Sequence, residues 1–101
     1  MGSALTDRAI ERLTMRVSRE RLTRGPQIGT AHAFRATDHD GDPILDITLV
    51  AAGDALALDA WETAALTRHL RNALAAAGEE AFPVLRFVSA SEAGGLRPAA
   101  A

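Results

Sequence analysis

Two alternating segments joined by a polar turn constrain this chain more than any other feature. The segment AHAFRAT is followed by the turn DHDGDP and then by ILDITLVA. Alternation on both sides of a turn rich in Asp and Gly is typical of a β-hairpin. If residues 40–41 form a two-residue turn, Phe34 faces Ile47 on an apolar face. On the opposite face the same register pairs Arg35 with Asp46, two opposite charges.

Further strands are expected after the hairpin. A tight turn at residues 53–54 predicts a third strand that places Leu56 and Leu58 on the same apolar face as Ile47. The run FPVLRFV, after Glu80, is rich in residues that favour strands and predicts one more. The apolar face of such a sheet needs a cover.

The segment DAWETAALTRHLRNALAAAG, residues 59–78, has the features of that cover. Asp59 is an N-cap residue, Glu62 completes a capping box, and Gly78 ends the helix. An apolar stripe at helical spacing suits packing on a sheet. The stripe consists of Leu66, Leu70, Ala73, Leu74 and Ala77.

The N-terminal segment, residues 7–24, is ambiguous between helix and strand. Thr6 is an N-cap residue, and Ile10, Leu13 and Val17 recur at helical spacing, which favours an amphipathic helix. Leu13, Met15 and Val17 also alternate with polar residues, which is a strand pattern. The helix is the preferred interpretation because the segment is bounded by a cap and by a Gly-Pro stop signal at residues 25–26.

These elements together predict an α+β fold. We expect a small antiparallel sheet of three to four strands, with one or two helices packed on one face. The 101 residues suffice for one domain with one core, over residues 7–88. Residues 1–6 and 89–101 are predicted to be flexible ends.

Composition narrows the functional classes. The chain has no cysteine, so disulfides, thiolate metal sites and a thiol nucleophile are excluded. No segment of about 18 apolar residues is present, so neither a leader nor a membrane span is predicted, and the expected location is the cytoplasm. The serines lack an elbow motif and no Gly-rich phosphate loop precedes a helix. We therefore predict a non-enzymatic protein with no catalytic residue, cofactor or small-molecule substrate.

The acidic turn and the histidines do not predict a metal site. Asp38, Asp40 and Asp42 alternate as in a calcium loop, but Gly41 is in the fourth place rather than the sixth, and the twelfth place is Leu49. A polar hairpin turn is the preferred interpretation. His32, His39 and His69 lack the short spacing of metal-binding histidine pairs. In the expected register His32 lies on the apolar face of the sheet.

Trp61 marks the predicted interaction surface. It lies about 180° from Leu70 on the helix, within a smooth face of small residues. Such a face allows close approach of a partner, and tryptophan is a favoured anchor. We predict a homodimer, or a complex with another protein, through Trp61, Ala65, Arg68 and Asn72. The alternative is that Trp61 packs on the N-terminal helix of its own chain.

An arginine stripe supports the alternative function, accessory nucleic-acid binding. Residues 7–26 contain six arginines and no lysine. On a helix, Arg8, Arg12, Arg16 and Arg19 fall within about 80° of one another. Guanidinium groups in a row suit contacts to phosphates. The competing interpretation is a solvated face, in which Asp7, Glu11 and Glu20 are local partners of the arginines.

Overall fold

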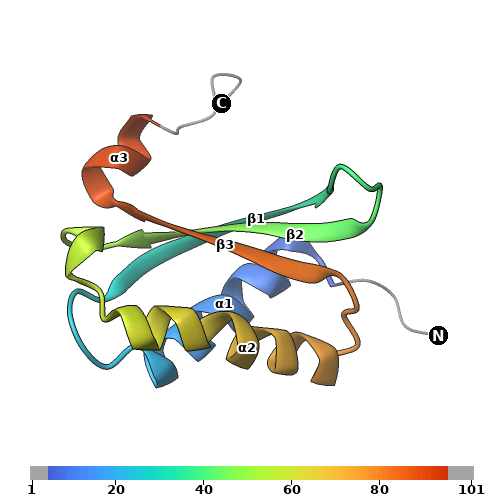
Figure 1. The fold of residues 1–101 in the computed structure, drawn as a ribbon, viewed down its shortest axis with the longest axis horizontal. Helices are drawn as coiled ribbons and strands as arrows, with labels where there is room; N and C mark the ends of the chain where they lie inside the picture. Colours follow the sequence, from blue (N-terminus) through green and yellow to red (C-terminus); the bar gives the residue numbers. More distant parts are fainter. Residues whose placement is uncertain (1–4, 96–101) are drawn as a thin grey trace.

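A computed structural model of the chain describes residues 5–95, which form a three-stranded sheet with two long helices on one face. The elements are α1 (Asp7–Arg21), β1 (Ile28–Thr37), β2 (Pro43–Ala51), a 3₁₀ turn (Ala55–Ala57), α2 (Ala60–Ala76), β3 (Phe82–Ser89) and α3 (Ala90–Gly95). β2 is the central strand, between β1 and β3. Both long helices lie on the same side of the sheet, and α3 rises on the other side at one end (Figure 1). The predicted α+β class is confirmed.

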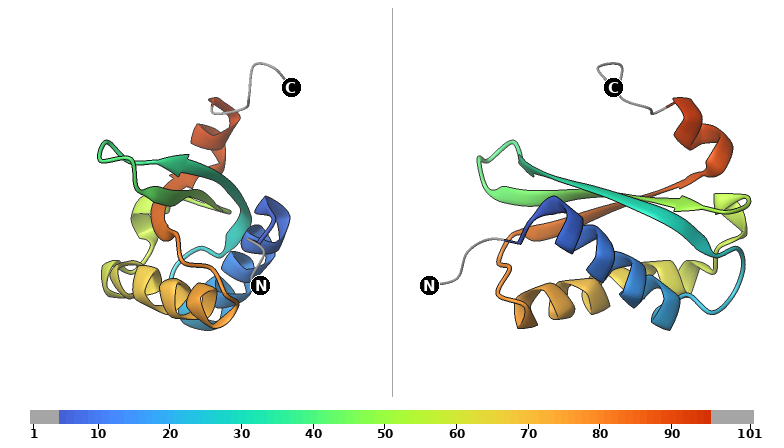
Figure 2. Two further views of the ribbon diagram at one scale, coloured as in Figure 1. Left: turned by 90° about the vertical axis from the view of Figure 1, so that its right-hand side faces the viewer. Right: turned by 180° about the vertical axis from the view of Figure 1, so that it is seen from behind.

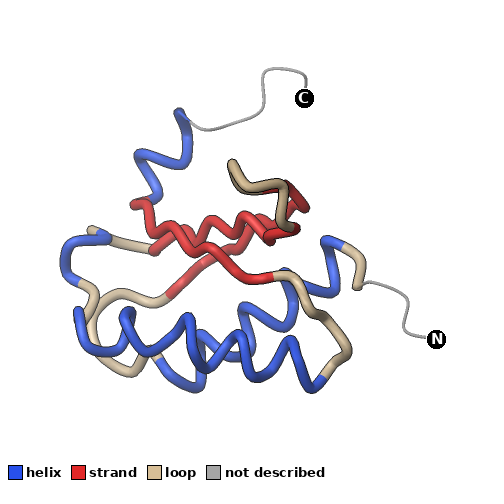
Figure 3. The backbone as a smooth tube through the Cα atoms, turned by 45° about the vertical axis from the view of Figure 1, so that its right-hand side comes forward, coloured by secondary structure: helices blue, strands red, loops and turns tan. Residues whose placement is uncertain are grey.

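The core lies between β2 and the two long helices. Leu45, Ile47 and Leu49 point from β2 toward the helices and are fully buried. The leucine stripe of α2 meets them, as predicted, with Leu66 and Leu70 fully buried. The tube in Figure 3 shows the same two layers, with helices beneath strands.

Helix α1 settles the ambiguity of the N-terminal segment. The Thr6 side chain accepts a hydrogen bond from the Ala9 N–H at 3.0 Å, which is N-cap geometry. Ile10 and Val17 are buried, as the helical interpretation requires. The helix ends at Arg21, three residues earlier than expected. The reason is tertiary, because the N–H groups of Thr23 and Arg24 bind the Glu62 carboxylate instead.

The predicted hairpin forms, but its register is wrong by one residue. Phe34 lies opposite Asp46 on the face away from the helices, and Arg35 lies opposite Leu45. The loop is longer than the assumed two-residue turn: Asp38 N–H donates to Asp42 O, and Gly41 has φ +84°. This pattern belongs to a three-residue loop closed by a glycine. Because side chains alternate with a period of two, a shift of one residue moves each side chain of β1 to the other face.

The predicted third strand after residues 53–54 is also wrong. Residues 55–57 form a 3₁₀ turn, in which Ala57 N–H donates to Asp54 O. Leu58, which directly follows this turn, is half-buried against the core. It therefore contacts the core without being part of a strand. The third strand is instead β3, which pairs with β2 in parallel, so the sheet is mixed. The long connection through α2 is what a parallel neighbour requires.

Helix α2 begins and ends near the predicted residues. Asp59 accepts the Glu62 N–H at 3.0 Å, so half of the predicted capping box is present. Glu79 N–H donates to Leu74 O, and Gly78 has φ +89°, which together close the C-terminal end of the helix. Trp61 projects into solvent with 86% of its surface exposed. The alternative in which Trp61 packs against its own chain is therefore ruled out.

The two ends of the chain are described in part. Residues 1–4 and 96–101, within the segments predicted to be flexible, lie outside the described residues. Residues 90–95 form the short helix α3. None of the helices within residues 5–95 combines the length and the apolar character needed to cross a bilayer.

Candidate functional site

The sheet has one face that neither long helix covers, named the open face here, with α3 at one end of it. The two long helices, α1 and α2, lie against the opposite face, as the two views in Figure 2 show. The open face consists of Thr30, His32, Phe34, Ala36, Ile44, Asp46, Thr48, Val50, Phe82, Val84, Arg86 and Val88. Three of its large apolar side chains are unusually exposed, with 53% for Phe34, 45% for Phe82 and 42% for Val84, whereas Val50 and Val88, at the end near α3, are buried. Among the described residues, only Trp61 is a further large hydrophobic residue of this kind.

Charges lie in the middle of the open face and apolar groups around them. Arg86 and Asp46 are on neighbouring strands with a nitrogen–oxygen distance of 3.9 Å. Phe34 and Val84 flank Asp46 on either side in the same row of the sheet. Phe82, at one corner, is also contacted from α2 by the Arg71 guanidinium, 5.2 Å from the ring centroid. The face therefore offers apolar area together with one charge of each sign.

The predicted Trp61 surface is present as a continuous side of α2. Arg68 and Asn72 are exposed and Ala65 is half-buried. Apart from Trp61 itself, these side chains are small or polar. The surface is thus smooth, with a single large apolar group at its end.

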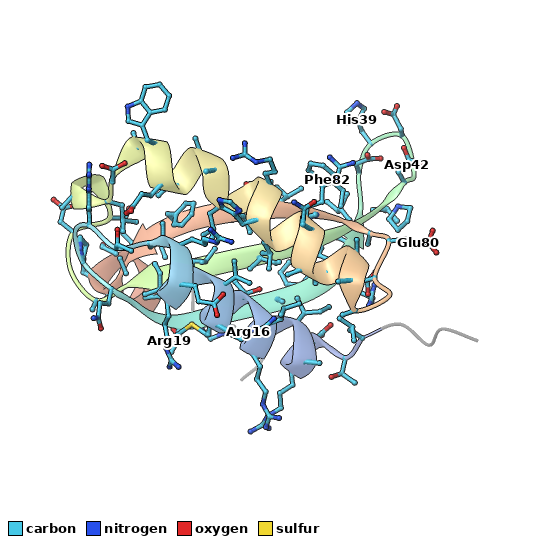
Figure 4. The ribbon with its side chains drawn as sticks, turned by 90° about the horizontal axis from the view of Figure 1, so that it is seen from below. Arg16, Arg19, His39, Asp42, Glu80 and Phe82 are labelled. Carbon is cyan, nitrogen blue, oxygen red and sulfur yellow. The ribbon has the colours of Figure 1, made fainter. Side chains whose placement is uncertain are left out.

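The predicted arginine stripe lies along the outer side of α1. Arg8, Arg12, Arg16 and Arg19 are all exposed, and Figure 4 shows Arg16 and Arg19 on this helix. The ion pairs between described residues involve Arg24, Arg35, His39 and Arg86, so the expected local partners do not engage the stripe. Four guanidinium groups therefore remain available to a ligand.

A groove separates the arginine stripe from the free edge of β1. Arg8, Arg12 and Arg19 line it from α1, and residues 29–31 line it from β1, around an open volume of about 800 Å³. Glu11 crosses it and accepts the Ala33 N–H at 2.8 Å. This bond occupies a backbone donor on the strand edge, which hinders addition of another strand there.

The acidic turn brings its carboxylates together without further structure around them. Ligand oxygens of Asp38, Asp40 and Asp42 lie within 4.8 Å of one another, at the hairpin tip that Figure 4 marks by His39 and Asp42. One Asp38 oxygen already accepts the N–H groups of Asp40 and Asp42, both at 2.9 Å. The cluster is therefore explained by the turn itself.

The histidines lie apart from one another. His32 is exposed on the open face, on the side opposite to the one predicted. His69 is half-buried on α2, where partial desolvation and the nearby Arg21 and Arg68 lower its pKa. His39 is at the hairpin tip. The described histidines thus form no common site.

An ion pair that sequence reasoning missed closes the end of the core near the N-terminus. Glu79 is buried, and its carboxylate accepts hydrogen bonds from both terminal guanidinium nitrogens of Arg35. The hydrogen bonds from Arg35, opposed by burial and aided by the Ala81 N–H, lower the pKa of Glu79 to about 2. The wrong register hid this pair, because it placed Arg35 on the other face. Glu79 directly follows Gly78, which ends the helix, and this position is the sequence feature that could have indicated the ion pair.

Comparison with protein-family models, with curated proteins and with solved structures finds no match to this chain.

Proposed function

We propose that this protein is a small, non-enzymatic interaction module that forms a homodimer through its open face. The observation that carries the proposal is the exposure of Phe34 and Val84 on either side of Asp46, on the side of the sheet away from the long helices. Phe82 lies at the corner, next to Arg71. Large apolar side chains that gather in one exposed patch mark interaction sites, whereas single ones are ordinary. The patch spans both edge strands, so its whole width is available to a partner.

A second copy of this chain has the chemistry that such a patch requires. In a two-fold interface the same patch meets itself, so every group needs a complement within the patch. Asp46 and Arg86 provide one charge of each sign at the centre, so that each can face the other across the two-fold axis. Phe34 and Val84, on the two sides of Asp46, supply apolar area on both halves.

The size of the open face limits the area that a dimer can bury. Its strands contain 10, 9 and 8 residues. With about 3.3 Å per residue and about 4.8 Å between strands, the face covers roughly 400 Å² per partner. Stable interfaces bury about 800 Å² per partner. The dimer is therefore expected to be weak and to dissociate on dilution.

The Trp61 surface is the second candidate for the same function. It offers one large aromatic anchor, but Ala65, Arg68 and Asn72 add little apolar area around it. Interfaces draw their energy from clustered buried anchors, and the open face has three such groups against one. The predicted contact through Trp61 is therefore ranked below the open face.

The test compares sedimentation of the wild type with two variants over a wide concentration range. Phe34→Thr combined with Val84→Thr removes apolar area and keeps strand propensity, so we expect a folded monomer at every concentration. Trp61→Ala is the matched control, and its association should equal that of the wild type. A wild type that stays monomeric at the highest concentration contradicts the proposal. Loss of the dimer in Trp61→Ala alone would move the interface to α2.

A further inference from the structure

A small hollow at one end of the groove contains an unpaired buried hydroxyl. The hollow lies between the C-terminal part of α1 and the start of β1, with a volume of about 340 Å³. Ser18 lines it and is 2% exposed, and its Oγ has no hydrogen-bond partner within the described chain. Thr14, one turn earlier, has its hydroxyl satisfied by the Ile10 carbonyl at 2.7 Å. Buried polar groups are nearly always satisfied, but the Ser18 Oγ has almost no accessible surface in this conformation, so a ligand in the hollow can reach it only after the side chain rotates.

The strand side of the hollow leaves room for that ligand. The register of β1 against β2 shifts between Ile28 and Thr30, and the bulged residue between them is Gly29. Gly29 lines both the hollow and the groove, and it has no side chain to fill either. A bulge next to an open hollow is a common arrangement at binding sites.

Positive charge continues from the hollow along the groove. Arg19 lines both spaces, while Arg12 and Arg8 follow along α1. With a rise of about 1.5 Å per residue, these three residues span roughly 16 Å of the helix. Asp7 and Glu11 also line the groove, but the Glu11 carboxylate is held by the Ala33 N–H. Charges spaced over this length suit a repeating polyanion better than a single anion.

We propose that the groove binds the phosphate backbone of a nucleic acid, with one phosphate held by the Arg19 guanidinium and, once its side chain has turned toward the hollow, by the Ser18 hydroxyl. Arg12 and Arg8 contact successive phosphates along the strand. A peptide strand added to the β1 edge is the weaker alternative, because Glu11 occupies the donor that such a strand needs. No aromatic residue lines the groove or the hollow. Binding is therefore expected to be weak and indifferent to sequence.

The first test measures binding of labelled single-stranded and duplex 20-mers by fluorescence anisotropy at several salt concentrations. Three phosphate contacts predict a slope of log affinity against log salt of roughly −2 for a single strand and −3 for a duplex. The combined change of Arg8, Arg12 and Arg19 to Ala should remove most of this slope. Arg21→Ala, an exposed arginine on the same helix outside the groove, should match the wild type. Absence of binding at low salt, or equal loss in Arg21→Ala, overturns the proposal.

The second test isolates the hydroxyl. Ser18→Ala should weaken binding about tenfold, because it removes a hydrogen bond to a charged group. Its melting temperature should be unchanged or higher, since an unpaired buried polar atom is lost. Wild-type affinity in Ser18→Ala contradicts the assigned anchor. A competition experiment adds inorganic phosphate to the complex of protein and labelled 20-mer. If phosphate displaces the 20-mer at a concentration no higher than that of the nucleotide phosphates, the hollow binds a free anion and the proposed backbone contact is wrong.

Discussion

Gly25 is the residue whose position is most restricted by its surroundings. It has φ +79°, and a Cβ added there would overlap the Ala57 carbonyl oxygen. Gly41 has nearly the same φ, +84°, with nothing within 4 Å of an added Cβ. The pair therefore separates backbone strain from a steric clash.

We expect Gly41→Ala to cost about 1–2 kcal/mol of stability from the left-handed backbone alone. Gly25→Ala should cost about 1–3 kcal/mol more, because the 3₁₀ turn at residues 55–57 must move. Urea unfolding of both variants measures the difference. If both variants lose the same stability, the 3₁₀ turn at residues 55–57 moves away from the added Cβ without a cost in free energy.

Glu79 links stability to acidic pH. Its pKa is about 2 in the folded protein, against an ordinary value of 4.5. A lowered carboxyl pKa stabilises the fold above the ordinary value and ceases to do so as pH falls from about 4.5 to 2. From the relation of pKa to free energy, this contribution is roughly 2–3 kcal/mol, since Arg35 is partly screened by solvent.

The corresponding experiment is denaturant unfolding at pH 7, 4.5 and 2.5. The wild type should lose stability over this acid range, and Glu79→Gln should lose less because its side chain does not titrate. Parallel losses in both proteins would assign the acid dependence to other carboxylates.

At the residue scale, sequence reasoning succeeded where helical periodicity decides. Trp61 was expected to face away from Leu70 and does so, and Thr6 and Asp59 are N-caps as expected. Phe34 was placed on the wrong face because its orientation depends on the length of the neighbouring turn. The length of the turn is decided by the hydrogen bond from the Asp38 N–H to Asp42 and by the positive φ of Gly41. Neither can be read from the sequence alone.

At the scale of elements, one carboxylate joins the two long helices. The Glu62 side chain was expected to close a capping box on Asp59, but it accepts the N–H and hydroxyl of Thr23 and the N–H of Arg24. These bonds, the hydroxyl of Thr23 foremost, lower the pKa of Glu62. The segment leaving α1 is thereby attached to the first turn of α2.

Replacement of Glu62 by Ala should loosen this attachment. Hydrogen exchange of the Thr23 and Arg24 amides is expected to accelerate more than that of the β2 amides, and the melting temperature should fall. Glu20→Ala, an exposed carboxylate on α1, is the control. Unchanged exchange at Thr23 would show that packing alone holds the segment.

The partners of strands are harder to foresee than the strands themselves. Residues 82–88 were correctly given strand character, although the strand also includes Ser89, and the helix before them was correctly bounded. Their parallel pairing with β2 was missed, because a tight turn at residues 53–54 suggested an antiparallel neighbour. The N–H groups of Ala57 and Leu58 are instead hydrogen-bonded within a 3₁₀ turn. The second edge of β2 therefore pairs with β3.

At the scale of the whole molecule, the two proposed surfaces do not compete. The open face lies across the sheet from the two long helices (Figure 1), whereas the groove lies between α1 and the edge of β1. A dimer through the open face would leave both grooves accessible. Two linked grooves would bind a long nucleic acid more tightly than one, because the second contact becomes intramolecular.

The parallel pairing of β2 with β3 also imposes an order of assembly. β1 and β2 are joined by a short loop and can associate as soon as both have been synthesised. β3 comes from residues 82–89 and reaches β2 only after the intervening helix has folded back. Closing so long a connection is entropically costly and slow. During synthesis, the central strand therefore has one unpaired edge until residues 82–89 have left the ribosome and reached it.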